Sequence, residues 1–135
     1  TTAERQARSR HDWALADQLE ADFPTFLTRW YEQHLFASLR QHPAFSEILR
    51  QRSQNRPAEL AKSLRYMGTG QQPSLWETLT AIEPPLLLVV GADDHKFCTI
   101  NQAMLQRCSA AHLLAIPACG HTPHLEAPQV FASSL

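Results

Sequence analysis

An uninterrupted apolar run, Leu86 to Val90, constrains this chain more than any other feature of its sequence. Pro84-Pro85 precedes the run and Gly91 follows it, which is typical of a strand buried on both faces of a parallel sheet. A helical segment near residues 99–107 and a second apolar segment, residues 112–116, come next. A strand, a crossover helix and a parallel second strand place the chain in the α/β class.

Two strands alone do not form a stable sheet, because a strand as apolar as residues 86–90 needs further neighbours to cover it. We therefore expect this chain to be the C-terminal part of a larger α/β domain. Missing upstream sequence, a partner chain or self-association would complete the sheet. We also expect Thr99 to cap the crossover helix and a last helix to follow residue 121.

The first half of the chain has a helical period instead. Four apolar stripes recur at three- and four-residue spacing, and a proline stands near the start of each of the last three. The stripes span residues 13–23, 26–31, 45–49 and 60–64. Gly68 is positioned to end the fourth helix. We divide the chain into a helical part, residues 1–68, and a βαβα part, residues 69–135.

Charge and composition exclude several classes of function. Twelve basic and thirteen acidic side chains give a net charge of −1, which argues against a nucleic-acid-binding protein. No apolar run approaches the roughly 20 residues of a membrane-spanning helix, and residues 1–10 do not resemble a signal peptide. Only 4 of the 135 residues are glycine, and no phosphate-binding motif is present. Three cysteines without CxxC spacing indicate a reducing compartment, so we expect a cytoplasmic protein.

Each predicted strand is followed by a side chain that can do chemistry. Asp94 follows the first strand, and His121 follows the second. Because parallel strands end at the same edge of a sheet, the two side chains should lie within reach of each other. They would form two members of a Ser-His-Asp triad, and the order acid then histidine is that of α/β-hydrolases. The alternative is that Asp94 caps a turn and His121 is a surface histidine.

Two other interpretations of this region stay open. His121 and His124 could share a metal with the acidic and histidine side chains at 93–95, although no HExxH motif or cysteine pair supports this. Cys119 could be a thiol nucleophile, but its place in a tight loop favours a small packed residue. We expect His124 and Glu126 to start and cap the last helix.

Several segments resemble known families. Residues 91–97 (GADDHKF) and 116–128 (IPACGHTPHLEAP) resemble the acid and histidine segments that end α/β-hydrolase-fold proteins. The first half resembles a narrower family, the MenH-type 2-succinyl-6-hydroxy-2,4-cyclohexadiene-1-carboxylate (SHCHC) synthases of menaquinone and phylloquinone biosynthesis. The segments that carry this resemblance are residues 4–8 with Asp12, residues 30–31 and 35–38, Arg52-Ser53, and residues 67–76. The resemblance covers nearly the whole chain but only the C-terminal half of such an enzyme.

The resemblance implies an α/β-hydrolase fold with a helical cap, residues 1–68, and a lyase that eliminates pyruvate from a polycarboxylate substrate without a cofactor. It implies that His121 activates a serine while Asp94 orients His121. Arg8 and Arg52 would bind substrate carboxylates, because a guanidinium pairs with a carboxylate through two hydrogen bonds, and Trp30 would wall the pocket. As alternatives, any one of the ten arginines can be a solvated helix residue, and Trp30 can be plain core.

The nucleophile itself is missing from the sequence. None of the nine serines stands in a GxSxG context, which positions the nucleophile of this fold. We therefore expect the serine to lie upstream of Thr1 and this chain to be inactive by itself. The competing interpretations are a hydrolase of esters or carbon–carbon bonds on the same fold, and a non-catalytic helical interaction domain with a degenerate hydrolase tail.

Overall fold

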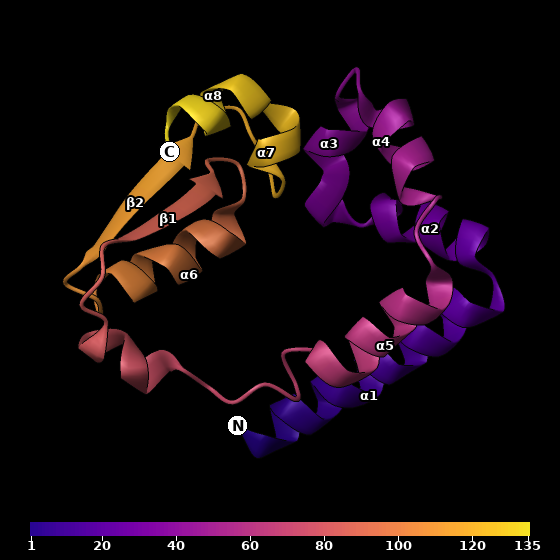
Figure 1. Ribbon diagram of the computed structural model, residues 1–135, viewed down its shortest axis with the longest axis horizontal. Coiled ribbons are helices and arrows are strands. Elements are labelled where there is room, and N and C mark those ends of the chain that lie inside the picture. Colours follow the sequence, from indigo (N-terminus) through magenta and orange to yellow (C-terminus); the bar gives the residue numbers. More distant parts are fainter. The chain divides into compact units, whose positions relative to one another are not determined.

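Figure 1 shows the computed structural model of the protein, which describes all 135 residues. The chain forms two compact units, one of residues 1–32 with 46–74 and one of residues 33–45 with 75–135. These units do not coincide with the division expected at residue 68, because residues 33–45 pack with the C-terminal part of the chain. The roles of the two parts as cap and core stay predictions.

The first unit consists of helices that bury the predicted apolar stripes. They are α1 (Thr2–Ala21), α2 (Phe23–Glu32), α4 (Phe45–Arg52) and α5 (Pro57–Met67). α1 and α5 lie side by side (Figure 1), and Ala16, Leu19 and Ala61 form their shared core. Trp13 does not belong to this buried stripe and is 43% exposed, because Asp12 takes the buried position in that turn of α1.

The ends of these helices follow local signals in the sequence. Pro57 is the first residue of α5, where its missing N–H costs no hydrogen bond. Gly68 ends α5, as expected, but in an extended conformation with a φ of −65° rather than a left-handed one. Thr1 and Glu4 exchange hydrogen bonds in a capping box at the start of α1.

The second unit contains the sheet. Two strands, β1 (Leu86–Gly91) and β2 (Ala111–Ile116), pair in parallel, with Leu86 opposite Ala111 and Gly91 opposite Ile116. The helix α6 (His95–Leu105) is the crossover between them, which confirms the predicted order of strand, helix and parallel strand. The shorter helices of this unit are η1 (His34–Phe36), α3 (Ala37–Gln41), η2 (Trp76–Ala81), α7 (Pro123–Glu126) and α8 (Pro128–Ser133).

β1 is not buried on both faces, contrary to the expectation from its apolar run. Leu88 packs into a core with Leu79, Cys108 and Ala111, whereas Leu87 is 42% exposed. Successive side chains of a strand point to opposite faces, so within this chain the face of β1 with Leu87 is less covered than the face with Leu88. None of the helices is both long and apolar enough to cross a membrane.

The start of α6 also differs from the expectation. The helix begins at His95, and Asp94 rather than Thr99 is its N-cap. The Oδ1 atom of Asp94 accepts a hydrogen bond from the backbone N–H of Phe97 at 3.2 Å. Thr99 lies inside the helix, where its hydroxyl donates to the His95 carbonyl. The polar loop after β1 is therefore shorter than the sequence pattern indicated.

Candidate active site

Asp94 and His121 meet at the carboxyl ends of the two strands, as predicted. The Oδ2 atom of Asp94 lies 2.7 Å from Nδ1 of His121. The Asp94 side chain is 5% exposed and the His121 side chain 29% exposed, so the histidine is the accessible member of the pair. A carboxylate can only accept hydrogen bonds, which assigns the proton to Nδ1 and leaves Nε2 free to take up another. This is the geometry of a general base oriented by an acid.

The two loops that carry the pair are joined through their backbones. The N–H of Ala92 donates to the Ile116 carbonyl, and the N–H of Asp93 donates to the Cys119 carbonyl, both at 2.9 Å. A Cβ atom on Gly91 would collide with the carbonyl oxygens of Cys119 and Gly120. Glycine at position 91 therefore permits the close approach that brings Asp94 to its partner.

Two aromatic rings contact the imidazole of His121. The ring of Phe97, from α6, lies 4.6 Å from it between centroids, and the ring of Phe36, from η1, lies 6.1 Å away in an edge-on arrangement. Sequence reasoning did not find either residue as part of the site. Phe36 belongs to the segment at residues 35–38 that carries the family resemblance, and the structure gives this segment a place beside the histidine.

Glu126, expected only to cap the last helix, also contacts the histidine loop. Its Oε2 atom accepts from the Gly120 N–H at 2.9 Å. Its Oε1 atom accepts from the backbone N–H and the hydroxyl of Thr122 at 3.1 and 2.8 Å. These three donors belong to Gly120 and Thr122, the immediate neighbours of His121 in the chain. A carboxylate five residues after a loop histidine is the signal in the sequence that could have found this contact.

Arg8 forms a second pair with a buried carboxylate, in the other unit. Its Nε atom lies 2.8 and 3.0 Å from the two oxygens of Asp12, one turn further along α1. The Asp12 side chain is 2% exposed and the Arg8 side chain 53% exposed. The terminal nitrogens of Arg8 make no hydrogen bond within the chain, so they are available to an anion. Asp12 was not among the predicted site residues.

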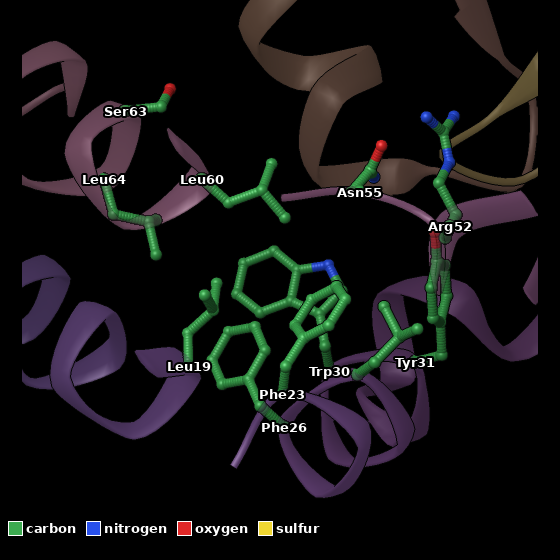
Figure 2. A pocket seen from close by; sticks show the side chains of 11 residues that line it. Leu19, Phe23, Phe26, Trp30, Tyr31, Arg52, Asn55, Leu60, Ser63 and Leu64 are labelled. Atoms are coloured by element: carbon green, nitrogen blue, oxygen red, sulfur yellow. The ribbon is translucent and has the colours of Figure 1, made fainter. Parts of the chain in front are cut away.

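Arg52 and Trp30 share a pocket in the first unit, and Arg8 does not line it. The pocket has a volume of about 280 Å³. In Figure 2 the indole of Trp30 lies among apolar side chains, and Arg52 stands with Asn55 at the polar side. Trp30 is stacked on Phe26 with ring centroids 5.7 Å apart. The pocket is lined by Leu19, Phe23, Phe26, Leu27, Trp30, Tyr31, Arg52, Asn55, Leu60, Ser63 and Leu64.

The two alternative chemistries at the histidine loop gain no support. No three side chains of His, Cys, Asp or Glu come together where they could hold a metal ion, so the donor set around His121 and His124 is not assembled. Burial raises the pKa of the Cys119 thiol, and the nearby charges of Glu126 and Asp93 raise it further. A thiol that stays protonated is a poor nucleophile, and Cys119 is the packed residue that was expected.

An aspartate that meets a later histidine at the strand ends of a parallel sheet is typical of proteins with the α/β-hydrolase fold. The chain belongs to that class, because the sequence pattern described as the alpha/beta hydrolase family matches residues 3–134. The expected fold class is thereby confirmed, and the small parallel sheet is consistent with part of such a core.

Two relatives and one solved structure are similar to this chain over nearly its whole length. A protein of Bacillus subtilis, provisionally named a 2-succinyl-6-hydroxy-2,4-cyclohexadiene-1-carboxylate synthase, is 37% identical over 97% of this chain and 49% of its own length. The synthase of that name from Serratia proteamaculans is 35% identical over 98% of this chain and 50% of its own length. A solved structure of MenH from S. aureus matches 99% of this chain and 52% of its own, with 34% identity and a TM-score of 0.94. The chain thus spans about half the length of the relatives it matches.

Proposed function

We propose that this chain is the C-terminal part of an SHCHC synthase, a carbon–oxygen lyase that eliminates pyruvate from a polycarboxylate precursor in cytoplasmic menaquinone or phylloquinone biosynthesis. The observation that carries the proposal is the Asp94–His121 pair, at 2.7 Å, in a chain similar to synthases of that name over nearly its whole length. The same pair would serve an ester or carbon–carbon bond hydrolase, so the substrate assignment depends on the arginines.

In this mechanism His121 is the base. Its Nε2 atom takes the proton of a serine hydroxyl from the remainder of the enzyme, and Asp94 holds the imidazole in the required tautomer. The activated serine removes a proton from the carbon beside a substrate carboxylate. The electron pair released there breaks the carbon–oxygen bond, and the leaving group departs as the enolate of pyruvate. This enolate takes up the proton held on His121 and becomes pyruvate, which restores the neutral imidazole. No metal or organic cofactor takes part in the proposed step.

The substrate carboxylates would be bound by Arg8 and Arg52. Asp12 binds the Arg8 guanidinium through Nε, so the donors of its two terminal nitrogens are left for an anion. Arg52 stands at the polar side of the aromatic pocket that Trp30 walls (Figure 2), where a charged group and an apolar ring can bind together. Two separate guanidinium groups suit a substrate with several carboxylates better than a neutral ester.

The experiment compares the 135-residue chain with the full-length protein that contains it. We expect the full-length protein to release pyruvate from the synthase substrate and the chain alone to release none, because none of its nine serines has the context of a nucleophile. Replacement of His121 by Gln in the full-length protein should lower the rate of pyruvate release by roughly 10⁶-fold and leave only a small residual rate. Hydrolysis of simple esters without release of pyruvate would support the hydrolase instead, and an unchanged activity of His121→Gln would support a non-catalytic domain.

A further inference from the structure

Glu126, at the end of α7, brackets His121. Its two carboxylate oxygens accept from the backbone N–H of Gly120 on one side of the histidine and of Thr122 on the other. Neither N–H donates to a backbone carbonyl, so Glu126 satisfies both. The Thr122 hydroxyl adds a third bond at 2.8 Å. A side chain that ties down both neighbours of a residue fixes that residue's Cα position and the direction in which its side chain leaves the backbone.

A fourth hydrogen bond ties this bracket to a segment far away in the sequence. The hydroxyl of Ser38, in α3, donates to Glu126. A Cβ atom on Gly120 would collide with the Ser38 Oγ and would lie 3.5 Å from Oε1 of Glu126, so the three residues are closely packed. Phe36, two residues before Ser38, contacts the His121 ring. The segment at residues 36–38 therefore touches both the histidine and the carboxylate that brackets it.

The carboxylate is the form that these donors require. Burial by itself would raise the pKa of Glu126, but the hydrogen bonds from Gly120, Ser38 and Thr122 outweigh it and hold the pKa below its ordinary value. Glu126 is therefore ionised at neutral pH and has no proton to donate. Charge-assisted hydrogen bonds of this kind are stronger than those between neutral groups.

We propose that Glu126 is a positioning residue, which holds the loop at residues 120–122 so that the His121 imidazole faces its reaction partner while bound to Asp94. The proposal rests on the proposed role of His121 as the base. The structural alternative is that Glu126 only caps α7. The two differ in one respect: a positioning residue affects the reaction only through His121, whereas a cap affects the amount of folded protein.

The test uses Glu126→Gln in the full-length protein, with Glu47→Gln as the matched control. Glu47 accepts three hydrogen bonds, from Arg50 and Gln51, but all within its own exposed helix turn. We expect Glu126→Gln to lower kcat by roughly 10- to 100-fold with KM nearly unchanged, since small displacements of a reacting group have effects of that size. Glu47→Gln should leave both constants unchanged.

A double-mutant cycle separates the two roles. In a His121→Ala background, Glu126→Gln should produce no further loss, because the group it positions is absent. An equal loss in both backgrounds, or an unchanged kcat in folded Glu126→Gln, would overturn the proposal. If Glu126→Gln does not fold, Thr122→Val and Ser38→Ala each remove one hydrogen bond and should lower kcat severalfold, and unchanged values would overturn it equally.

A spectroscopic measurement distinguishes this proposal from the proposed function. The proton between His121 Nδ1 and Asp94 Oδ2 gives a downfield NMR signal when the short hydrogen bond is ordered. We expect this signal to persist in Glu47→Gln and to broaden or disappear in Glu126→Gln. If no pyruvate is released by the wild type but the signal behaves in this way, the synthase assignment fails and the role of Glu126 stands. A signal unchanged in Glu126→Gln refutes the positioning role.

Discussion

The two units of the chain each hold a buried aspartate against a more exposed cationic or basic side chain. Asp12 holds Arg8, and Asp94 holds His121, with shortest N–O distances of 2.8 and 2.7 Å. The first pair needs only one turn of helix, because its members are four residues apart on α1. The second pair needs two strands, a crossover helix and two joined loops, because its members are 27 residues apart.

This difference determines which changes in the chain would disrupt the geometry of each pair. The Arg8–Asp12 pair is formed within one turn of α1, and a residue elsewhere in the chain disturbs it only where it packs against Asp12, as Gly68 does. The Asp94–His121 pair is assembled by the sheet and by the loops at its edge, so it is sensitive to the backbone positions of Gly91 and Gly120. In both pairs a buried carboxylate holds its partner side chain in place. The helix α1 fixes the position of Asp12, whereas tertiary contacts fix the position of Asp94.

The largest effect is expected from the catalytic pair. Asp94→Asn in the full-length protein keeps the shape and the helix cap but offers an N–H₂ group to Nδ1, which favours the wrong tautomer of His121. Loss of the orienting acid costs a triad roughly 10⁴-fold in kcat. Asp93→Asn, an exposed neighbour in the same loop, is the control and should keep its activity. Rates of pyruvate release decide the question, and equal activities of the two variants would remove Asp94 from the mechanism.

The second comparison replaces the glycine beside each pair with alanine. At Gly91 the new Cβ meets backbone carbonyls, which cannot move aside, whereas at Gly68 it meets mainly the Asp12 carboxylate and the Leu64 carbonyl. We expect Gly91→Ala to lower the free energy of unfolding by about 3 kcal/mol and Gly68→Ala by about 1 kcal/mol, within the range of overpacking. Urea denaturation of the full-length variants measures both. A larger loss for Gly68→Ala would contradict the assignment of the local pair as the more tolerant one.

The third comparison tests whether the arginines select the substrate. Arg8→Ala and Arg52→Ala should each raise KM for the polycarboxylate substrate by roughly 10- to 100-fold and change kcat little, because a lost charge-assisted hydrogen bond weakens binding by that amount. A small neutral ester, where one is turned over, should be affected little. Arg10→Ala, also on α1, is the control. Equal losses for both substrates would show that the arginines act on folding and not on the carboxylates.

The sequence predicted the Asp94–His121 pair but not the residues that pack around it. Five apolar residues between Pro85 and Gly91 were enough to place β1, and the parallel order then placed Asp94 beside His121. No periodicity connects Phe36 or Ser38 with the loop at residue 121, because such contacts are made only by tertiary packing. Their segment entered the sequence argument through the family resemblance alone.

The prediction of the N-cap of α6 was wrong, because two polar residues near the start of this helix can both act as a cap. Asp94 and Thr99 can both cap a helix, and the expectation chose Thr99 because the loop after β1 looked long. The structure uses one oxygen of Asp94 as the cap and the other for His121. The start of α6 and the orientation of the histidine are thus set by the same carboxylate. Asparagine at position 94 keeps the oxygen that caps α6 but loses the acceptor for His121. Asp94→Asn therefore tests the orientation of the histidine separately from the cap.

The smallest expected effect is a pH dependence of stability that comes from the bracket around His121. The pKa of Glu126 in the folded protein is below its ordinary value of 4.5, so its ionised form stabilises the folded state at neutral pH. That contribution is lost as the pH falls from about 4.5 through the folded pKa, because protonation then removes the acceptor. Glu126→Gln should lose this part of the slope in urea denaturation between pH 3 and 7.

Glu47→Gln provides the matching curve for a carboxylate in a local set of hydrogen bonds. Hydrogen bonds from Arg50 and Gln51 lower the pKa of Glu47 to about 2, so its contribution persists to a lower pH than that of a group with a smaller shift. The Glu47 side chain is 51% exposed, and solvent screening keeps its effect on stability small. The difference between wild type and variant should therefore be larger for Glu126 than for Glu47 at neutral pH. A larger difference for Glu47 than for Glu126 would mean that the hydrogen bonds of Glu126 add little to the stability of the loop at residues 120–122.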